Sequence, residues 1–303
     1  MRARSRPRLD SIRGMPQTSR RTFVTQAAAL LPLSRAAFAK EPLTKNNLGV
    51  QLYTVRNVIE KNPGATLKAI QDIGYAEVET IYASLDKIWP ALRETDLKAV
   101  SVHVDTKIFM EGGAKLEATI ASLKQRGFRY LVVPYIAPAE RGGEDMFKNL
   151  ANKLNDAGKK AKASGLTLCY HNHAFEFGPV NGTTGLEILM NNTEKDLVSL
   201  ELDVFWASVA GRDPVSLLQT YSGRVALVHL KDKSKGIDTQ YNENVPKTAF
   251  KEVGSGTIDI PAVLSAADAA GVQHYFVEQD QTPGDPIASL RKSYEYLSKQ
   301  FKS

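Results

Sequence analysis

Two histidines close the segment 167–177, which begins as an apolar strand and then turns polar. His171 and His173 are two residues apart, so they share one face of an extended chain. Paired imidazoles at the carboxyl end of a strand suit a site that binds a metal or transfers protons. A pair of hydrogen-bonded surface histidines is the alternative interpretation, and this segment alone does not decide between the two.

Other polar residues end apolar segments in the same way. Buried charges are costly unless they have a partner or a purpose, so their repeated placement indicates a site. Imidazole and carboxylate ligands together suit Mn²⁺, Zn²⁺, Co²⁺ or Fe²⁺ better than Ca²⁺. The candidate metal ligands are His171, Asp203, His229 and Glu278, and the other polar residues at such ends are Gln51, Glu79, His103, His173 and Lys231.

Short apolar segments alternate with amphipathic ones from Leu48 onward, which predicts strands alternating with helices. Prolines near the starts of three helical segments and glycines after the ends of five mark the boundaries. The predicted strands are 48–55, 76–81, 99–104, 130–135, 167–173, 198–205, 225–231 and 275–278. The predicted helices are 63–73, 84–94, 114–126, 143–163, 186–191, 214–221, 260–270 and 286–300.

This order of elements predicts an α/β fold, a single (β/α)₈ TIM barrel. A doubly wound sheet is the rival, but it usually has a glycine-rich loop after its first strand, and 51–56 has none. Chemistry in such a barrel lies where the strands end, so the polar residues above would gather at one mouth. His274, at the start of a strand, would lie at the opposite end, and the polar segment 232–252 would form a loop over the mouth.

The charge of the chain is divided unevenly. Residues 1–39 hold eight arginines and one acid, and the remainder has 31 Lys and Arg against 32 Asp and Glu, a net charge of −1. The body therefore offers no electrostatic case for nucleic acid. The single cysteine, Cys169, excludes an internal disulfide and is expected to be an inert buried thiol.

The amino-terminal residues have the layout of an export signal. Ser19-Arg20-Arg21-Thr22-Phe23 resembles a twin-arginine motif, an apolar stretch of 27–33 follows, and Ala37-Phe38-Ala39 suits cleavage. We therefore expect a signal peptide over 1–39 and a periplasmic or secreted mature protein without a membrane segment. Met15 is an alternative start, and a disordered basic tail is the alternative interpretation.

Five motifs, taken together and in order, resemble the sugar phosphate isomerase/epimerase family, the xylose isomerase-like TIM barrels. The resemblance covers residues 46–302. The motifs are Leu48-Gly-Val-Gln-Leu-Tyr-Thr-Val-Arg56, Tyr170-His-Asn-His173, Leu200-Glu-Leu-Asp-Val-Phe-Trp206, Val228-His-Leu-Lys-Asp232 and Val277-Glu-Gln-Asp280.

The resemblance implies a divalent metal held by Glu, Asp, His and Glu from strands five to eight. Asp203, His229 and Glu278 match the last three, but His171 stands where the epimerases have glutamate. Glu176 is an alternative ligand if the strand bends. The two-glutamate proton exchange of the epimerases therefore cannot be carried over, and the His-Asn-His variant resembles the branch with inosose dehydratase-like proteins and proteins acting on 3-keto sugars.

A metal beside a carbonyl and a neighbouring hydroxyl makes the carbon between them more acidic, so that a positioned base can remove its proton. The candidates for proton transfer are Glu79, His173 and Glu278, and Lys231 is a candidate electrophile, with an ion pair to Asp232 or Glu201 as the alternative. Glu201 is expected inside the barrel below the site. The candidate substrate-binding residues are Gln51, Tyr53, His103 and Trp206.

These residues predict a metal-dependent isomerase or epimerase that acts on an unphosphorylated sugar or cyclitol. The first alternative is a lyase or hydrolase of 3-keto glycosides on the same metal site, and the second is a periplasmic carbohydrate-binding barrel without catalysis. Apurinic endonuclease chemistry shares the fold, but the net charge of the body argues against it. We expect a small-molecule carbohydrate as the partner, and homo-oligomerisation stays open.

Overall fold

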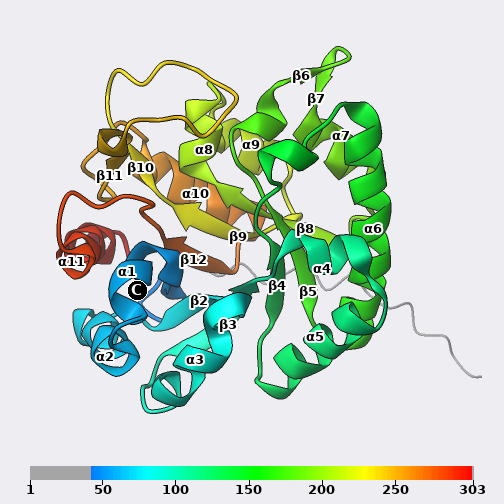
Figure 1. Cartoon of the computed structure of the whole chain (residues 1–303). Helices are drawn as coiled ribbons and strands as arrows, with labels where there is room; N and C mark the ends of the chain where they lie inside the picture. Colours follow the sequence, from blue (N-terminus) through cyan, green and yellow to red (C-terminus); the bar gives the residue numbers. More distant parts are fainter. Residues whose placement is uncertain (1–41, 302–303) are drawn as a thin grey trace, which may run out of the picture. The chain divides into compact units, whose positions relative to one another are not determined.

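Side chains alternate between the two faces of a strand, so a closed barrel places every second residue inside. The computed structural model, which describes residues 42–301, has such a barrel at its centre. Its strands lie in the order β1-β12-β9-β8-β5-β4-β3-β2, and neighbouring strands are parallel (Figure 1), which confirms the predicted fold class. The barrel strands are β1 Leu48–Gln51, β2 Glu77–Ile81, β3 Lys98–His103, β4 Tyr130–Val133, β5 Thr167–His171, β8 Val198–Asp203, β9 Val225–Leu230 and β12 His274–Val277.

Helices follow each barrel strand and cover the outside of the barrel (Figure 1). Asparagine or aspartate caps several of them; Asn62, for example, accepts a hydrogen bond from the backbone amide of Ala65 at the start of α2. Across residues 42–301, no helix is both long and apolar enough to cross a bilayer. The helices are α1 Arg56–Ile59, α2 Pro63–Ile73, α3 Tyr82–Leu92, α4 Thr106–Glu111, α5 Gly113–Gln125, α6 Glu144–Ala163, α7 Gly185–Asn192, α8 Val204–Val209, α9 Pro214–Thr220, α10 Ile260–Ala270 and α11 Pro286–Leu297.

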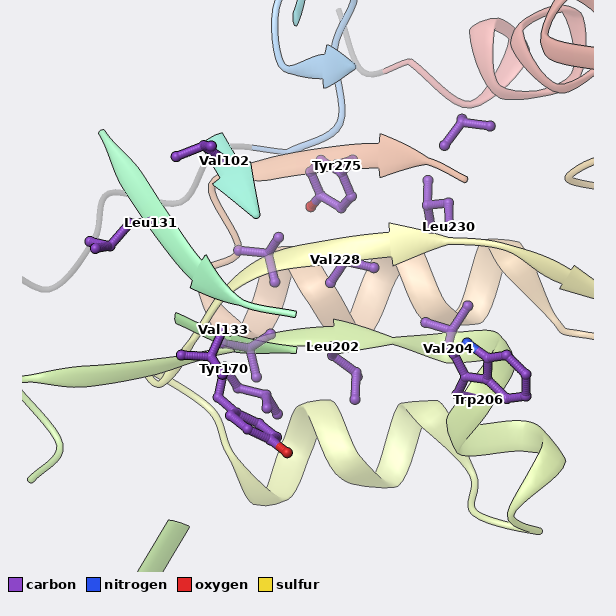
Figure 2. Close-up of a cluster of buried hydrophobic side chains, with 14 of the residues drawn as sticks. Val102, Leu131, Val133, Tyr170, Leu202, Val204, Trp206, Val228, Leu230 and Tyr275 are labelled. Carbon is purple, nitrogen blue, oxygen red and sulfur yellow. The ribbon is translucent and has the colours of Figure 1, made fainter. Parts of the chain in front are cut away.

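The buried apolar residues form two clusters. The larger cluster packs the strands against the helices, and Figure 2 shows part of it, including Leu131, Tyr170 and Val228. The smaller cluster comes from the opposite faces of the strands and fills the interior of the barrel; it includes the buried thiol of Cys169. At the floor of the barrel, His274 Nδ1 lies 2.6 Å from Glu77 Oε2. His274 therefore lies at the end opposite the mouth, as the sequence predicts.

Several strands end earlier than the sequence predicts. The strand predicted over 48–55 ends at Gln51 and turns into the 3₁₀ helix η1, Leu52–Val55. The strand predicted over 198–205 ends at Asp203, because the Asp203 carboxylate caps α8 by accepting a hydrogen bond from the amide of Trp206. The strand predicted over 167–173 ends at His171, so His173 lies beyond the strand, although its ring still contacts that of His171 with centroids 5.1 Å apart. Helix α4 was not predicted.

The segment 232–252 is a long loop with a structured base. Its ends form a two-stranded antiparallel sheet, β10 Asp232–Lys233 and β11 Phe250–Lys251, with the 3₁₀ helix η4, Lys247–Ala249, before β11. The buried Asp232 carboxylate accepts hydrogen bonds from the backbone amides of Lys233, Gly254, Gly256 and Ile258 at 2.8–3.1 Å. A Cβ at residue 256 would lie 2.2 Å from Asp232 Oδ1, so the sequence Gly254-Ser-Gly256 forms a cradle for a carboxylate.

The predicted signal peptide, the cleavage site and the expected export lie outside the described residues and stay predictions. The same holds for the predicted end of the barrel domain at residue 302.

Replacing Asp232 with alanine should destabilise the protein strongly, because four amides would lose an ionised acceptor in a buried place. Each charge-assisted hydrogen bond contributes about 1.5–3 kcal/mol, so we expect a loss on the order of 3 kcal/mol after partial rescue by water. In a domain of this size, thermal unfolding should shift down by roughly 5–10 °C. The exposed Asp238→Ala, in the same loop, serves as the control. Equal midpoints of thermal unfolding for the two variants would show that the hydrogen bonds of Asp232 do not stabilise the fold.

Candidate functional site

Four side chains from β5, β8, β9 and the end of β12 meet at the mouth of the barrel. His171, Asp203, His229 and Glu278 each offer one ligand atom, and these atoms all lie within 4.8 Å of one another. His229 Nδ1 lies 3.0 Å from Glu278 Oε2 and 4.0 Å from Asp203 Oδ2, and His171 Nε2 lies 3.8 Å from Asp203 Oδ2. Asp203 Oδ2 is buried, and its ion-pair partner is Lys231 Nζ at 3.0 Å. We call these four residues the upper group.

A second set, the lower group, lies deeper in the barrel. His103, His171, Glu201 and His229 also bring ligand atoms within 4.8 Å of one another. Glu201 Oε2 lies 2.8 Å from His103 Nε2, 3.0 Å from His171 Nδ1 and 3.4 Å from His229 Nε2. Because two histidines belong to both groups and a neutral imidazole has one free lone pair, one metal ion would use either group but not both.

Hydrogen bonding of the two shared histidines favours the upper group as the metal site. A histidine that binds metal through one nitrogen usually donates the other N–H to a carboxylate or carbonyl. With metal in the upper group, His171 Nδ1 faces Glu201 at 3.0 Å and His229 Nε2 faces Glu79 at 2.6 Å. With metal in the lower group, the Nε2–H of His171 would face Asp203 at 3.8 Å, which is too far for a hydrogen bond.

The charge of the site also fits a divalent cation. Four buried carboxylates and the partly buried one of Asp280 gather around it. Burial alone would lower the pKa of the imidazoles, but Glu79 and Glu201 outweigh it and raise the pKa of His103 to about 10 and that of His229 well above its usual value. Lys231 and these two imidazoles offset only part of the five negative charges, so negative charge is in excess. Lys231 Nζ lies 3.0 Å from Asp203, 2.7 Å from Glu278 and 2.7 Å from Asp280. The sequence-based alternative, which paired Lys231 with Asp232 or Glu201, was wrong. The carboxylates belong to Glu79, Glu201, Asp203, Glu278 and Asp280.

Burial and neighbouring charges set the protonation of these groups. Burial alone would lower the pKa of Lys231, but Asp203, Asp280 and Glu278 outweigh it and hold the pKa well above its usual value. Burial would raise the pKa of Glu278, but Lys231 and His229 outweigh it and hold the pKa far below the usual range. Lys231 therefore stays cationic and Glu278 stays ionised at neutral pH.

His173 lies beside this cluster, after the end of β5. Its ring centroid is 5.1 Å from that of His171, 5.0 Å from Tyr135 and 5.4 Å from Trp206. Burial, followed by the charge of Lys231, lowers the pKa of His173 well below its usual value, so the ring is neutral at pH 7. Its Nδ1 is buried and has no hydrogen-bond partner among the described residues, so the lone pair of this atom is unused.

Glu176 does not reach the metal cluster. It is fully buried, its Oε1 accepts a hydrogen bond from the Tyr170 hydroxyl at 2.8 Å, and its Oε2 accepts one from the His173 amide at 2.9 Å. It thereby orders the turn that carries His173. Of the two residues proposed for the strand-five ligand, the structure brings His171 to the other ligands.

Three of the remaining predicted site residues are buried. Glu79 is fully buried beneath His229 and also binds Gln51, Ser101 and His103, so neither Glu79 nor Gln51 faces an open mouth. Trp206 is buried, and its Nε1 has no hydrogen-bond partner.

The other two predicted positions differ in exposure. His103 binds Glu79 and Glu201, and its side chain is 11% exposed. Tyr53 is 41% exposed after β1, with the Arg56 guanidinium 4.0 Å from its ring centroid.

Three residues near the mouth were not predicted. Asp280 lies two residues after Glu278 within a quoted motif, and its type and spacing were a usable signal. Arg141, after β4, and Glu243, in the long loop, form an ion pair at 2.9 Å. They are 102 residues apart in segments without periodicity, so the sequence held no signal for their pairing.

Comparison with known proteins gives a consistent picture. A family model described as xylose isomerase-like TIM barrel matches residues 67–300. An inosose dehydratase of Clostridium perfringens (strain 13 / Type A) is 32% identical over 168 residues, 52% of this chain and 56% of that protein. The chain thus spans about half the length of the curated relatives it matches.

Solved structures show the same fold at lower identity. A sugar phosphate isomerase/epimerase from Parabacteroides distasonis ATCC 8503 superposes with a TM-score of 0.71 at 23% identity, covering 86% of this chain and 96% of that one. The IOLI protein, whose structure holds a zinc atom, superposes with a TM-score of 0.66 at 18% identity, covering 85% and 99%. At these identities the likeness concerns the fold alone.

Replacing Asp203 with alanine should abolish metal binding, because the upper group would lose the carboxylate between its two histidines. We expect less than about a tenth of an equivalent of metal after loading with Mn²⁺ or Zn²⁺, measured by elemental analysis, with the fold intact by circular dichroism. The control is His274→Gln, which breaks a buried histidine–carboxylate pair at the floor of the barrel and should keep the wild-type metal content. Full metal content in Asp203→Ala would exclude the upper group.

Replacing Glu176 with glutamine should change how stability depends on pH. Burial raises the pKa of Glu176 to about 8 from 4.5, so its folded-state proton is retained while the unfolded chain loses it. The resulting stability is present at low pH and is lost as pH rises from about 4.5 to 8, by about 1.4 kcal/mol per pH unit. The glutamine variant should lack this loss in thermal unfolding measured between pH 5 and 9, and the exposed Glu194→Gln should follow the wild type. Parallel curves for Glu176→Gln and the wild type would refute the shifted pKa.

Proposed function

The chain belongs to the xylose isomerase-like TIM barrel family, and from this premise we propose a metal-dependent enzyme that removes a proton next to the carbonyl of a sugar or cyclitol. The observation that carries this proposal is the meeting of His171, Asp203, His229 and Glu278 within 4.8 Å at the barrel mouth. The zinc held by a neighbour of the same fold supports a divalent metal here, of the type Mn²⁺, Zn²⁺, Co²⁺ or Fe²⁺.

The upper group would hold the metal, and Glu201 and Glu79 would fix the tautomers of its two histidines. A bound divalent cation supplies a Lewis acid that polarises a carbonyl and offsets negative charge developing on its oxygen. Lys231 adds a second positive charge beside Asp203 and Glu278.

Among the predicted bases, the geometry favours His173. The carboxylate of Glu79 is fully engaged below the mouth, and that of Glu278 is engaged with Lys231 and His229. The ring of His173 is neutral and has a free Nδ1. In the proposed step, His173 Nδ1 takes the proton from the carbon beside the carbonyl.

Elimination of water is the outcome that these residues favour. The C–H electron pair forms a C=C bond, the C–O bond at the β-carbon breaks, and His173 returns its proton to the departing hydroxyl to give water. Epimerisation, one of the two outcomes that the sequence favours first, usually needs a second group on the opposite face of the carbon. His171 stands at that position and is already engaged with Glu201. The dehydratase activity named for the curated relatives supports the same choice.

The substrate we propose is uncharged and unphosphorylated, in keeping with the expected export. Inosose, a ketone of an inositol, is the natural first probe because the relatives are named for it.

Incubation of the Mn²⁺-loaded protein with inosose in D₂O should give exchange at the carbon next to the carbonyl and an unsaturated ketone that absorbs in the ultraviolet. Both signals should disappear with a chelator, and His173→Ala should lower the rate by about 10²–10⁴-fold. The control Glu194→Gln, which changes an exposed carboxylate outside the site, should keep most of the rate. Exchange without the unsaturated product would indicate an isomerase or epimerase, and no exchange in the metal-loaded protein would favour a binding protein.

A further inference from the structure

The tip of the long loop reaches the far side of the barrel mouth. Figure 1 shows this loop beside β10 and β11, and the carboxylate of Asp232 holds its base. Near its tip, the backbone N–H of Gln240 donates to the carbonyl of Val209 at 3.1 Å, and Tyr241 lies close to Gly178 after β5. Glu243 then pairs with Arg141, which follows β4. The loop therefore bridges elements that belong to three barrel strands.

The Arg141–Glu243 pair is shielded but incompletely satisfied. The side chains are 16% and 20% exposed, and Arg141 Nη1 lies 2.9 Å from Glu243 Oε2. Arg141 Nε donates to the carbonyl of Ile136, and the guanidinium lies 3.8 Å from the ring centroid of Phe175, so it is held in place. Arg141 Nη2 and Glu243 Oε1 are nevertheless buried without a hydrogen-bond partner. In native structures such atoms are usually bound by water, an ion or a ligand.

A series of ring contacts connects this pair to the metal ligands. The Arg141 guanidinium lies 5.2 Å from the ring of Tyr135, which contacts His173, which in turn contacts His171. Two further buried atoms along this series, His173 Nδ1 and Trp206 Nε1, also lack partners. Unsatisfied polar atoms thus extend from the proposed base to the tip of the loop.

The chemistry of the pair restricts its ligand. A free donor beside a free acceptor matches a hydroxyl group, which accepts from Arg141 Nη2 and donates to Glu243 Oε1. A phosphate or carboxylate on the ligand would be repelled by Glu243, which already neutralises Arg141. We propose that Arg141 and Glu243 bind the hydroxyl-bearing end of an uncharged substrate that is distant from the metal, and that they select against its phosphorylated form. This inference rests on the proposed function for the location of the substrate.

The test is a binding measurement that does not depend on turnover. Titration calorimetry of the Mn²⁺-loaded protein with inosose and with an inosose monophosphate should show binding of inosose and at least tenfold weaker binding of the phosphate. Glu243→Gln should remove this preference, because the local charge becomes positive while the amide can still accept from Arg141. Arg141→Met should weaken inosose binding at least tenfold, at unchanged metal content.

Asp72→Asn is the matched control, because it changes an exposed ion pair with Lys68 on α2 and should bind both probes as the wild type does. Thermal unfolding of each variant separates a loss of binding from a loss of fold. Wild-type binding by folded Arg141→Met, an unchanged preference in Glu243→Gln, or no binding of inosose by the wild type would each overturn the inference. Binding with the expected preference but without exchange or elimination would instead defeat the proposed function and leave this inference standing.

Discussion

Compensation of buried negative charge is the constraint on which the rest of this structure depends. The inward-facing positions of β2 and β8 deliver Glu79, Glu201 and Asp203 into a space that water reaches poorly, and Glu278 and Asp280 follow at the end of β12. Carboxylates in such a place must be paired or neutralised. The imidazoles and Lys231 satisfy part of this requirement, and the remaining charge makes the site suited to a divalent cation.

The interior of the barrel has three layers with different roles: an ion pair at the floor, an apolar plug above it and a polar cluster at the mouth. Apolar side chains such as Cys169 and Phe276 form a plug in its interior, which separates the pair of Glu77 and His274 at the floor from the polar cluster at the mouth. The carboxylates just above this plug orient the histidines rather than meeting the substrate. The residues that remain open to chemistry are those at and beyond the strand ends. Such a division explains how one barrel can hold a rigid ligand set under loops that differ.

The sequence predicted the parts of the molecule that periodicity controls. The alternation of apolar segments identified the barrel, α2 begins and ends where Pro63 and Gly74 predict, and α10 ends where Gly271 predicts. Asp203, His229 and Glu278 could be placed because each ends a strand and strand ends meet at one mouth.

Periodicity predicted strands that are too long where a side chain ends the strand by capping the next turn. Asp203 stops β8 in this way, and the same kind of early ending moved His173 off the strand on which it was placed. The pairing of Arg141 with Glu243 depends on two loops meeting in space, and no local pattern encodes that. The partners of Lys231 likewise depend on the curvature of the barrel, which brings Asp280 nearer than its sequence neighbour Asp232.

The cradle around Asp232 has a consequence for how such a protein diversifies. Because the two ends of the loop are fastened to each other by one carboxylate, the stretch between them is a module whose length and composition can change while the barrel keeps its register. Under the proposed function, insertions, deletions or exchanges in this stretch would alter which molecules are admitted and leave the metal ligands undisturbed. Directed evolution toward new specificity would do best to begin there.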